Sequence, residues 1–131
     1  MKINVVEEFI ALASLNSPSR REAPVAAYLV KRLKELGRAA TVDDSAPLTG
    51  SDTGNLIVRV PGNAAGPTIL LCAHMDTVGP TEGMTPVIRD GVIYSNGETV
   101  LGADDKAGIA IILTVLAELQ AGDVLHGGRS E

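Results

Sequence analysis

The order of the elements predicted along the chain indicates an α/β fold, in which helices pack against a sheet. Two segments near the N-terminus and one near the C-terminus show helical spacing of apolar residues, and the predicted strands lie between them. Residues 68–73 form a short continuous apolar run, which is typical of a strand buried on both faces. The composition agrees, because 45% of the residues are hydrophobic but only 2% are aromatic, so the core depends on Val, Ile, Leu and Ala.

The first predicted helix begins after Asn4. Asn4 followed by Glu7 is a variant of the capping box, in which a side chain accepts hydrogen bonds from the first unpaired backbone N–H groups. Residues 16–19 contain Ser and Pro and break this helix. The apolar residues expected on one face of the helix are Val5, Phe9 and Leu12.

A second helix is predicted between Ser19 and Gly37. Ser19 and Glu22 have the spacing of a capping box, and Gly37 is a natural C-terminal stop. Pro24 is tolerated only in the first turn, so it favours a helix that begins later than Ser19. The apolar residues that recur at helical spacing are Val25, Leu29, Leu33 and Leu36.

The rest of the chain is predicted to contain strands, one hairpin and a long helix. Short strands are expected at residues 39–42, 56–60 and 68–73, with a loop over residues 43–54. Asp90-Gly91 between two apolar segments is typical of a hairpin with a type I′ turn. Residues 105–120 have helical spacing, and the first half is apolar nearly all round, which predicts a buried helix.

Composition and charge exclude several classes of protein. The net charge is −5 and no basic stripe exists, so we expect neither a nucleic-acid partner nor binding to an anionic membrane surface. Cys72 is the only cysteine, which rules out an intrachain disulfide and predicts a small apolar core residue. Residues 1–15 lack the apolar run of a secretory signal, and no stretch is long enough to span a membrane. We therefore expect one cytoplasmic domain.

The first chemical motif, His74-Met75-Asp76, directly follows the apolar run of residues 68–73. In open α/β sheets, ligands bind beyond the carboxyl ends of the strands. If the chain stays extended, His74 and Asp76 point to the same side, so one can ligate a metal while the other orients it. Taken alone, the motif is more often a polar strand end whose His caps nearby backbone groups.

The second motif, Asp104-Asp105-Lys106, stands at the start of the long helix. A carboxylate can bridge two cations, and two cations about 3.5–4 Å apart polarise a carbonyl and activate a water. The structural alternative is that Asp104 or Asp105 is a helix N-cap, with Lys106 solvated or paired with a neighbour. Alone, this motif too is more often structural.

Together, the two motifs resemble the N-terminal signatures of the M20 metallopeptidases. Residues 73–78, Ala-His-Met-Asp-Thr-Val, resemble the first signature, and residues 101–108, Leu-Gly-Ala-Asp-Asp-Lys-Ala-Gly, resemble the second. Thr53-Gly54-Asn55-Leu56 and Ser17-Pro18-Ser19 also match the peptidase T-like branch of that family. The resemblance extends from residue 3 to the end, and the order and spacing of the motifs make it specific.

The resemblance implies a three-layer αβα zinc-peptidase-like catalytic domain, of which residues 1–131 are an incomplete N-terminal portion. It implies that His74 binds one metal, that Asp104 bridges two metals, and that Asp76 is the catalytic-site residue that holds His74. The Asp104–Asp105 peptide bond is expected to be cis, and Lys106 is given no catalytic role. Zn²⁺ is the expected metal, two per complete site, with Co²⁺ and Mn²⁺ as alternatives.

The activity that the resemblance implies is hydrolysis of peptide bonds in short peptides, of the aminopeptidase type. We expect several family parts to be absent from this chain: a Glu-Glu pair with the general base, an acidic ligand, a C-terminal His, the lid or dimerisation domain, and the C-terminal half of the catalytic domain. Neither His126 nor Glu131 is expected to replace them. The 131-residue chain is therefore expected to be inactive on its own.

Two alternatives stay open. An incomplete sheet exposes an edge strand and helix faces, which favours self-association and a non-catalytic assembly module. The other alternative is a related M20 deacylase or carboxypeptidase, although residues 53–55 and 101–103 favour the peptide branch. The oligomeric state in solution discriminates the assembly module from the peptidase.

Overall fold

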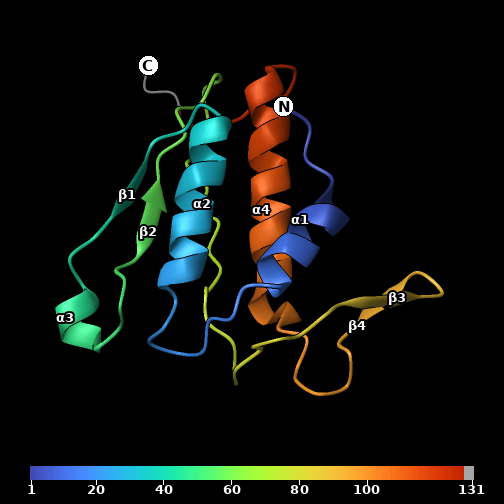
Figure 1. Cartoon of the computed structure of the whole chain (residues 1–131). Coiled ribbons are helices and arrows are strands. Elements are labelled where there is room, and N and C mark those ends of the chain that lie inside the picture. The colour runs from blue at the N-terminus through green and yellow to red at the C-terminus, as the bar shows by residue number, and fades with distance from the viewer. Residues whose placement is uncertain (129–131) are drawn as a thin grey trace.

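The computed structural model describes residues 1–128, which contain four helices and four short strands (Figure 1). Glu131 lies outside the described residues. The helices are α1 (Val5–Ala13), α2 (Ala23–Glu35), α3 (Ala46–Thr49) and α4 (Ala103–Ala121). The strands are β1 (Ala40–Val42), β2 (Leu56–Val58), β3 (Val87–Arg89) and β4 (Val92–Tyr94).

Helix α1 begins where the sequence predicted. The side chain of Asn4 accepts hydrogen bonds from the backbone N–H groups of Val6, at 3.0 Å, and Glu7, at 3.3 Å, so Asn4 is confirmed as the N-cap. The predicted apolar face is wrong at Val5, which is 39% exposed because this first turn extends beyond the packed part of the helix.

Helix α2 begins at Ala23, with Glu22 at the N-cap and Pro24 in the first turn, as the proline predicted. The predicted capping box of Ser19 and Glu22 is wrong, because the Ser19 hydroxyl donates a hydrogen bond to the carboxylate of Asp76 instead. The helix ends as expected before Gly37, whose φ of +70° is a left-handed conformation that favours glycine.

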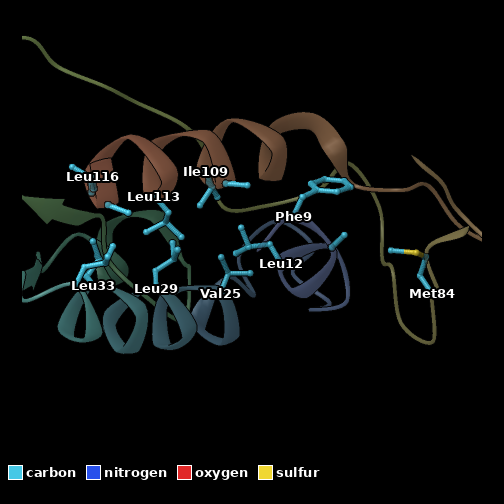
Figure 2. Close-up of a cluster of buried hydrophobic side chains, with 13 residues drawn as sticks. Phe9, Leu12, Val25, Leu29, Leu33, Met84, Ile109, Leu113 and Leu116 are labelled. Atoms are coloured by element: carbon cyan, nitrogen blue, oxygen red, sulfur yellow. The ribbon is translucent and has the colours of Figure 1, made fainter. Parts of the chain in front are cut away.

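The core lies between α1, α2 and α4. Figure 2 shows side chains of α2 pointing toward those of α4, with Phe9 and Leu12 of α1 beside them. Leu12 and Val25 are fully buried, and Leu113 is 2% exposed. Partly buried residues of the strands and extended segments also pack against this cluster, among them Leu56, Val58, Ala73 and Met75. Helices that pack on strands and extended segments confirm the predicted α/β class, and the domain is incomplete as expected.

The strands form two antiparallel pairs. Strand β1 pairs with β2, and β3 pairs with β4 through a turn in which Asp90 has φ +51° and Gly91 has φ +76°. Positive φ at both positions is the type I′ geometry predicted for the hairpin. Strand β2 ends at Val58, before the predicted end, and the short helix α3 lies within the segment predicted as a loop.

The prediction of a buried strand at residues 68–73 is wrong. Within residues 1–128 this segment joins no ladder, and Ile69 and Leu70 are 77% and 87% exposed. Cys72 is exposed as well, so its predicted place in the core is wrong. In α4, Ile111 is 56% exposed, against the expected burial all round. Among the described residues, no strand pairs with residues 68–73 to cover them.

Among residues 1–128, no helix combines the length and apolar character needed to cross a bilayer.

Candidate metal centre

The structure brings together the three site residues predicted from the two motifs. Nδ1 of His74 lies 2.9 Å from Oδ1 of Asp76, and Nε2 of His74 lies 3.0 Å from Oδ1 of Asp104. His74 and Asp76 follow the extended segment of residues 68–73, and Asp104 stands at the start of α4. The imidazole therefore lies between two carboxylates from separate parts of the chain.

The charges of these groups are coupled. Partial burial alone would lower the pKa of His74, but the hydrogen bonds with Asp104 and Asp76 outweigh it, and the pKa is raised. The hydrogen bond from Ser19, together with the charge of His74, lowers the pKa of Asp76 against a smaller opposing effect of burial. Asp76 is therefore held as a carboxylate, the form that can orient an imidazole.

The donor set fits a divalent cation. With Nδ1 donating its proton toward Asp76, Nε2 of His74 and Oδ1 of Asp104 are two acceptors held 3.0 Å apart. That separation requires a proton or a cation to join them. Ligand atoms at about 2.0–2.2 Å from one tetrahedral Zn²⁺ ion lie about 3.3–3.6 Å from each other, so the two atoms would have to separate by only a few tenths of an ångström to share an ion.

The ligand set within residues 1–128 is incomplete. No group of three or more His, Cys, Asp or Glu side chains in this range is placed to hold one ion. The reason is that Asp76 and Asp104 lie at opposite ring nitrogens of His74 and do not converge. The side chain of Asp104 is 87% exposed, which leaves it accessible to a further cation.

Asp105 has a different role from Asp104. The peptide bond between them is cis, as the resemblance implied. Oδ1 of Asp105 accepts a hydrogen bond from the backbone N–H of Gly108 at 3.2 Å. Asp105 thus pairs one of the backbone N–H groups that the first turn of α4 leaves without a helical partner. The structural alternative thus applies to Asp105, while Asp104 faces His74.

Lys106 and Ser19 are the site-related residues whose contacts sequence reasoning missed. Lys106 is fully buried, and its Nζ donates a hydrogen bond to the backbone carbonyl of Leu15. The idea that Lys106 is solvated is therefore wrong. Burial lowers the pKa of Lys106 to about 8.

Ser19 has the spacing of a helix cap but contacts Asp76 instead. His126, which was not expected to be a ligand, lies with its ring nitrogens near the carbonyls of Val124 and Pro61.

Comparison with known proteins shows that this chain is similar to peptidases. The sequence model of "Peptidase family M28" matches residues 55–127. The uncharacterized protein YqjE of Bacillus subtilis is 37% identical over 94% of this chain and 33% of its own length. Peptidase T of Citrobacter koseri is 30% identical over 94% of this chain and 39% of its own length.

Two solved structures share the fold. The aminopeptidase PepT from Bacillus cereus matches with a TM-score of 0.84 and 38% identity, over 94% of this chain and 33% of that protein. A tripeptidase from Staphylococcus aureus matches with a TM-score of 0.88 and 33% identity, over 97% of this chain and 35% of that protein. The chain therefore spans about a third of the length of the relatives that it matches.

The motifs in the sequence predicted the M20 family, which none of these matches names, so that assignment stays a prediction. The peptidase T-like character predicted with it is confirmed by the matches to peptidase T and to PepT. Because the family model covers more than half of its residues, the chain belongs to peptidase family M28, and it is similar to peptidase T-like aminopeptidases.

Proposed function

We propose that this chain is the metal-binding N-terminal portion of the catalytic domain of a cytoplasmic, zinc-dependent aminopeptidase that cleaves short peptides, with metal-binding motifs that resemble those of the M20 metallopeptidases. The observation that carries the proposal is the placement of His74 between Asp76 and Asp104, at 2.9 and 3.0 Å. The names of two relatives, an aminopeptidase and a tripeptidase, support the substrate class.

Each of the three residues has a separate task in this proposal. Asp76 accepts a hydrogen bond from Nδ1–H of His74 and thereby leaves Nε2 free to act as the ligand atom. His74 would hold one ion, and Asp104, which has two carboxylate oxygens, would contribute to holding both. The bound ions would supply Lewis-acid polarisation of the scissile carbonyl and activation of a water.

The 131-residue chain alone is proposed to be inactive. Within residues 1–128 no Glu forms a hydrogen bond or ion pair with His74 or Asp104, so no general base stands beside the ligands. Incubation of the purified chain with tripeptides and Zn²⁺ should release no free amino acids. Robust, metal-dependent cleavage by this chain would contradict the proposal that it needs a general base from outside these residues.

A fusion tests the function itself. Residues 1–128 replace the matching third of the Bacillus cereus aminopeptidase, and cleavage of tripeptides is measured beside cleavage of acyl-amino acids. We expect tripeptide cleavage that a chelator abolishes, that is lost in His74→Ala and Asp104→Ala, and that persists in the exposed control Asp44→Ala. A folded fusion that retains activity without Asp104, or that cleaves acyl-amino acids alone, would overturn the proposal.

A second candidate function, self-association as an assembly module, is favoured by the uncovered segment of residues 68–73. Ile69 and Leu70 are 77% and 87% exposed, and this segment lines an open cavity of about 1240 Å³ together with β2, α2 and α4. Sedimentation velocity of the chain and of Leu70→Lys decides this candidate. A concentration-dependent oligomer that the substitution dissolves supports it, and a monomer at all concentrations refutes it.

A further inference from the structure

Ser17-Pro18-Ser19 lies alongside the residues that flank Asp76. The Ser17 hydroxyl donates a hydrogen bond to the carbonyl of Met75 at 2.8 Å, and the N–H of Thr77 donates to the carbonyl of Ser17 at 2.9 Å. Pro18 and Thr77 form a parallel bridge. Since Ser17 is fully buried and Thr77 is 2% exposed, the backbone on both sides of Asp76 is held in place.

Ser19 extends this contact to the side chain of Asp76. The Ser19 hydroxyl donates to Oδ2 of Asp76, while Oδ1 of the same carboxylate lies 2.9 Å from Nδ1 of His74. The backbone carbonyl of Asp76 lies 3.0 Å from the same Nδ1 and is a second partner of the ring. Two partners on two oxygens fix the plane of the carboxylate, and the plane sets the direction in which the imidazole is held. We propose that Ser19 is a positioning residue that fixes the orientation and tautomer of His74 through Asp76.

The same segment is tied to the element that carries Asp104. Nζ of Lys106, in the first turn of α4, donates to the carbonyl of Leu15, and the N–H of Thr81 donates to the side chain of Asn16 at 2.8 Å. Residues 15–19 therefore contact both the extended segment that carries His74 and Asp76 and the helix that carries Asp104. These anchors do not involve the exposed Ser19 side chain, so Ser19→Ala should leave the fold intact.

The inference rests on the proposed metal-binding role of His74, and its first test needs no metal. The ¹⁵N signals of the His74 ring are recorded for the metal-free chain at one pH at which the imidazole is neutral. We expect the Nδ1–H tautomer in the native chain and in Ser19→Thr. In Ser19→Ala we expect a partial shift toward the Nε2–H tautomer, because the backbone carbonyl of Asp76 still accepts from Nδ1. Ser14→Ala is the matched control, because its hydroxyl donates at 2.7 Å to the carbonyl of Ile10, within α1.

The second test is a double-mutant cycle on Zn²⁺ affinity, measured by titration calorimetry. Loss of a residue that directly orients a ligand costs about 10–100-fold in metal affinity, so we expect roughly 3- to 10-fold for Ser19→Ala, one step further away. Ser19→Thr should restore the affinity, and Ser19→Ala should add nothing once Asp76→Ala is present.

The outcomes separate this inference from the function on which it rests. Ring signals in Ser19→Ala that match the native chain, or an equal loss of affinity with and without Asp76, would overturn the role of Ser19. A native chain that binds no Zn²⁺ would contradict the proposed function, and the metal-free ring signals would still decide whether Ser19 orients His74.

Discussion

Gly102 directly precedes α4 and lies two residues before Asp104 of the candidate metal centre. Its replacement by alanine should lower the free energy of unfolding by an amount that can be worked out from the structure. Its backbone has φ +79° and ψ +22°, a left-handed conformation that costs a non-glycine residue roughly 1–2 kcal/mol. A Cβ atom would also lie 2.9 Å from Cγ2 of Thr77, well inside the carbon–carbon contact distance of about 3.5–4.0 Å. Because Thr77 is buried, relief of this overlap costs about another 1–2 kcal/mol.

We therefore expect Gly102→Ala to lower the free energy of unfolding by roughly 2–4 kcal/mol. Urea unfolding followed by far-UV circular dichroism measures it, since the chain has no Trp. Gly122→Ala is the matched control at the other end of α4, with φ +90° and no atom within 4 Å of the added Cβ, so its cost should be the backbone part alone.

Thr77→Ser removes the methyl group that the new Cβ would meet. In that background, Gly102→Ala should cost about 1 kcal/mol less than in the native chain, because only the steric part is relieved. Equal costs for Gly102→Ala and Gly122→Ala, or no relief by Thr77→Ser, would refute the steric reasoning.

Two further predictions concern the core and the buried polar network. Leu113→Ala, at a site 2% exposed between α2 and α4, should destabilise the chain by about 2–5 kcal/mol in urea, whereas Leu70→Ala, 87% exposed, should stay within about 0.5 kcal/mol. Burial, together with the carboxylate of Glu8, raises the pKa of Tyr28 to about 12. As the pH rises, the Tyr28 hydroxyl therefore loses its proton in the unfolded chain before it does so in the folded chain. The free energy of unfolding should fall between pH 10 and 12, by about 1–2 kcal/mol for this half-buried group. Tyr28→Phe should remove that part of the alkaline loss, and Tyr94→Phe, on the exposed hairpin, should keep it; identical alkaline curves for the native chain and Tyr28→Phe would contradict the assignment.

Local signals predicted most of the helices and turns. Asn4, Pro24 and Gly37 marked the beginning of α1, the beginning of α2 and the end of α2, because each acts on the backbone within a few residues. Asp90-Gly91 predicted the hairpin for the same reason. The two chemical motifs also predicted which side chains meet, since one follows the extended segment of residues 68–73 and the other stands at the start of α4.

The remaining features depend on contacts that leave no local signal. Ser19 had the spacing of a helix cap, but its partner, Asp76, is 57 residues away. The partner of Lys106 is a backbone carbonyl 91 residues away, which no side-chain pattern encodes. The apolar run of residues 68–73 indicates a preference for burial, but it does not specify which element would cover it.

Titration calorimetry with Zn²⁺ tests most directly whether His74 and Asp104 form a metal half-site. The native 131-residue chain is compared with His74→Ala, Asp104→Ala and the exposed control Asp44→Ala. We expect binding in the native chain and in Asp44→Ala, and a loss of at least about tenfold in both ligand variants. Absent binding in the native chain, or affinity that is equal in all four proteins, would contradict the metal centre and the function proposed from it.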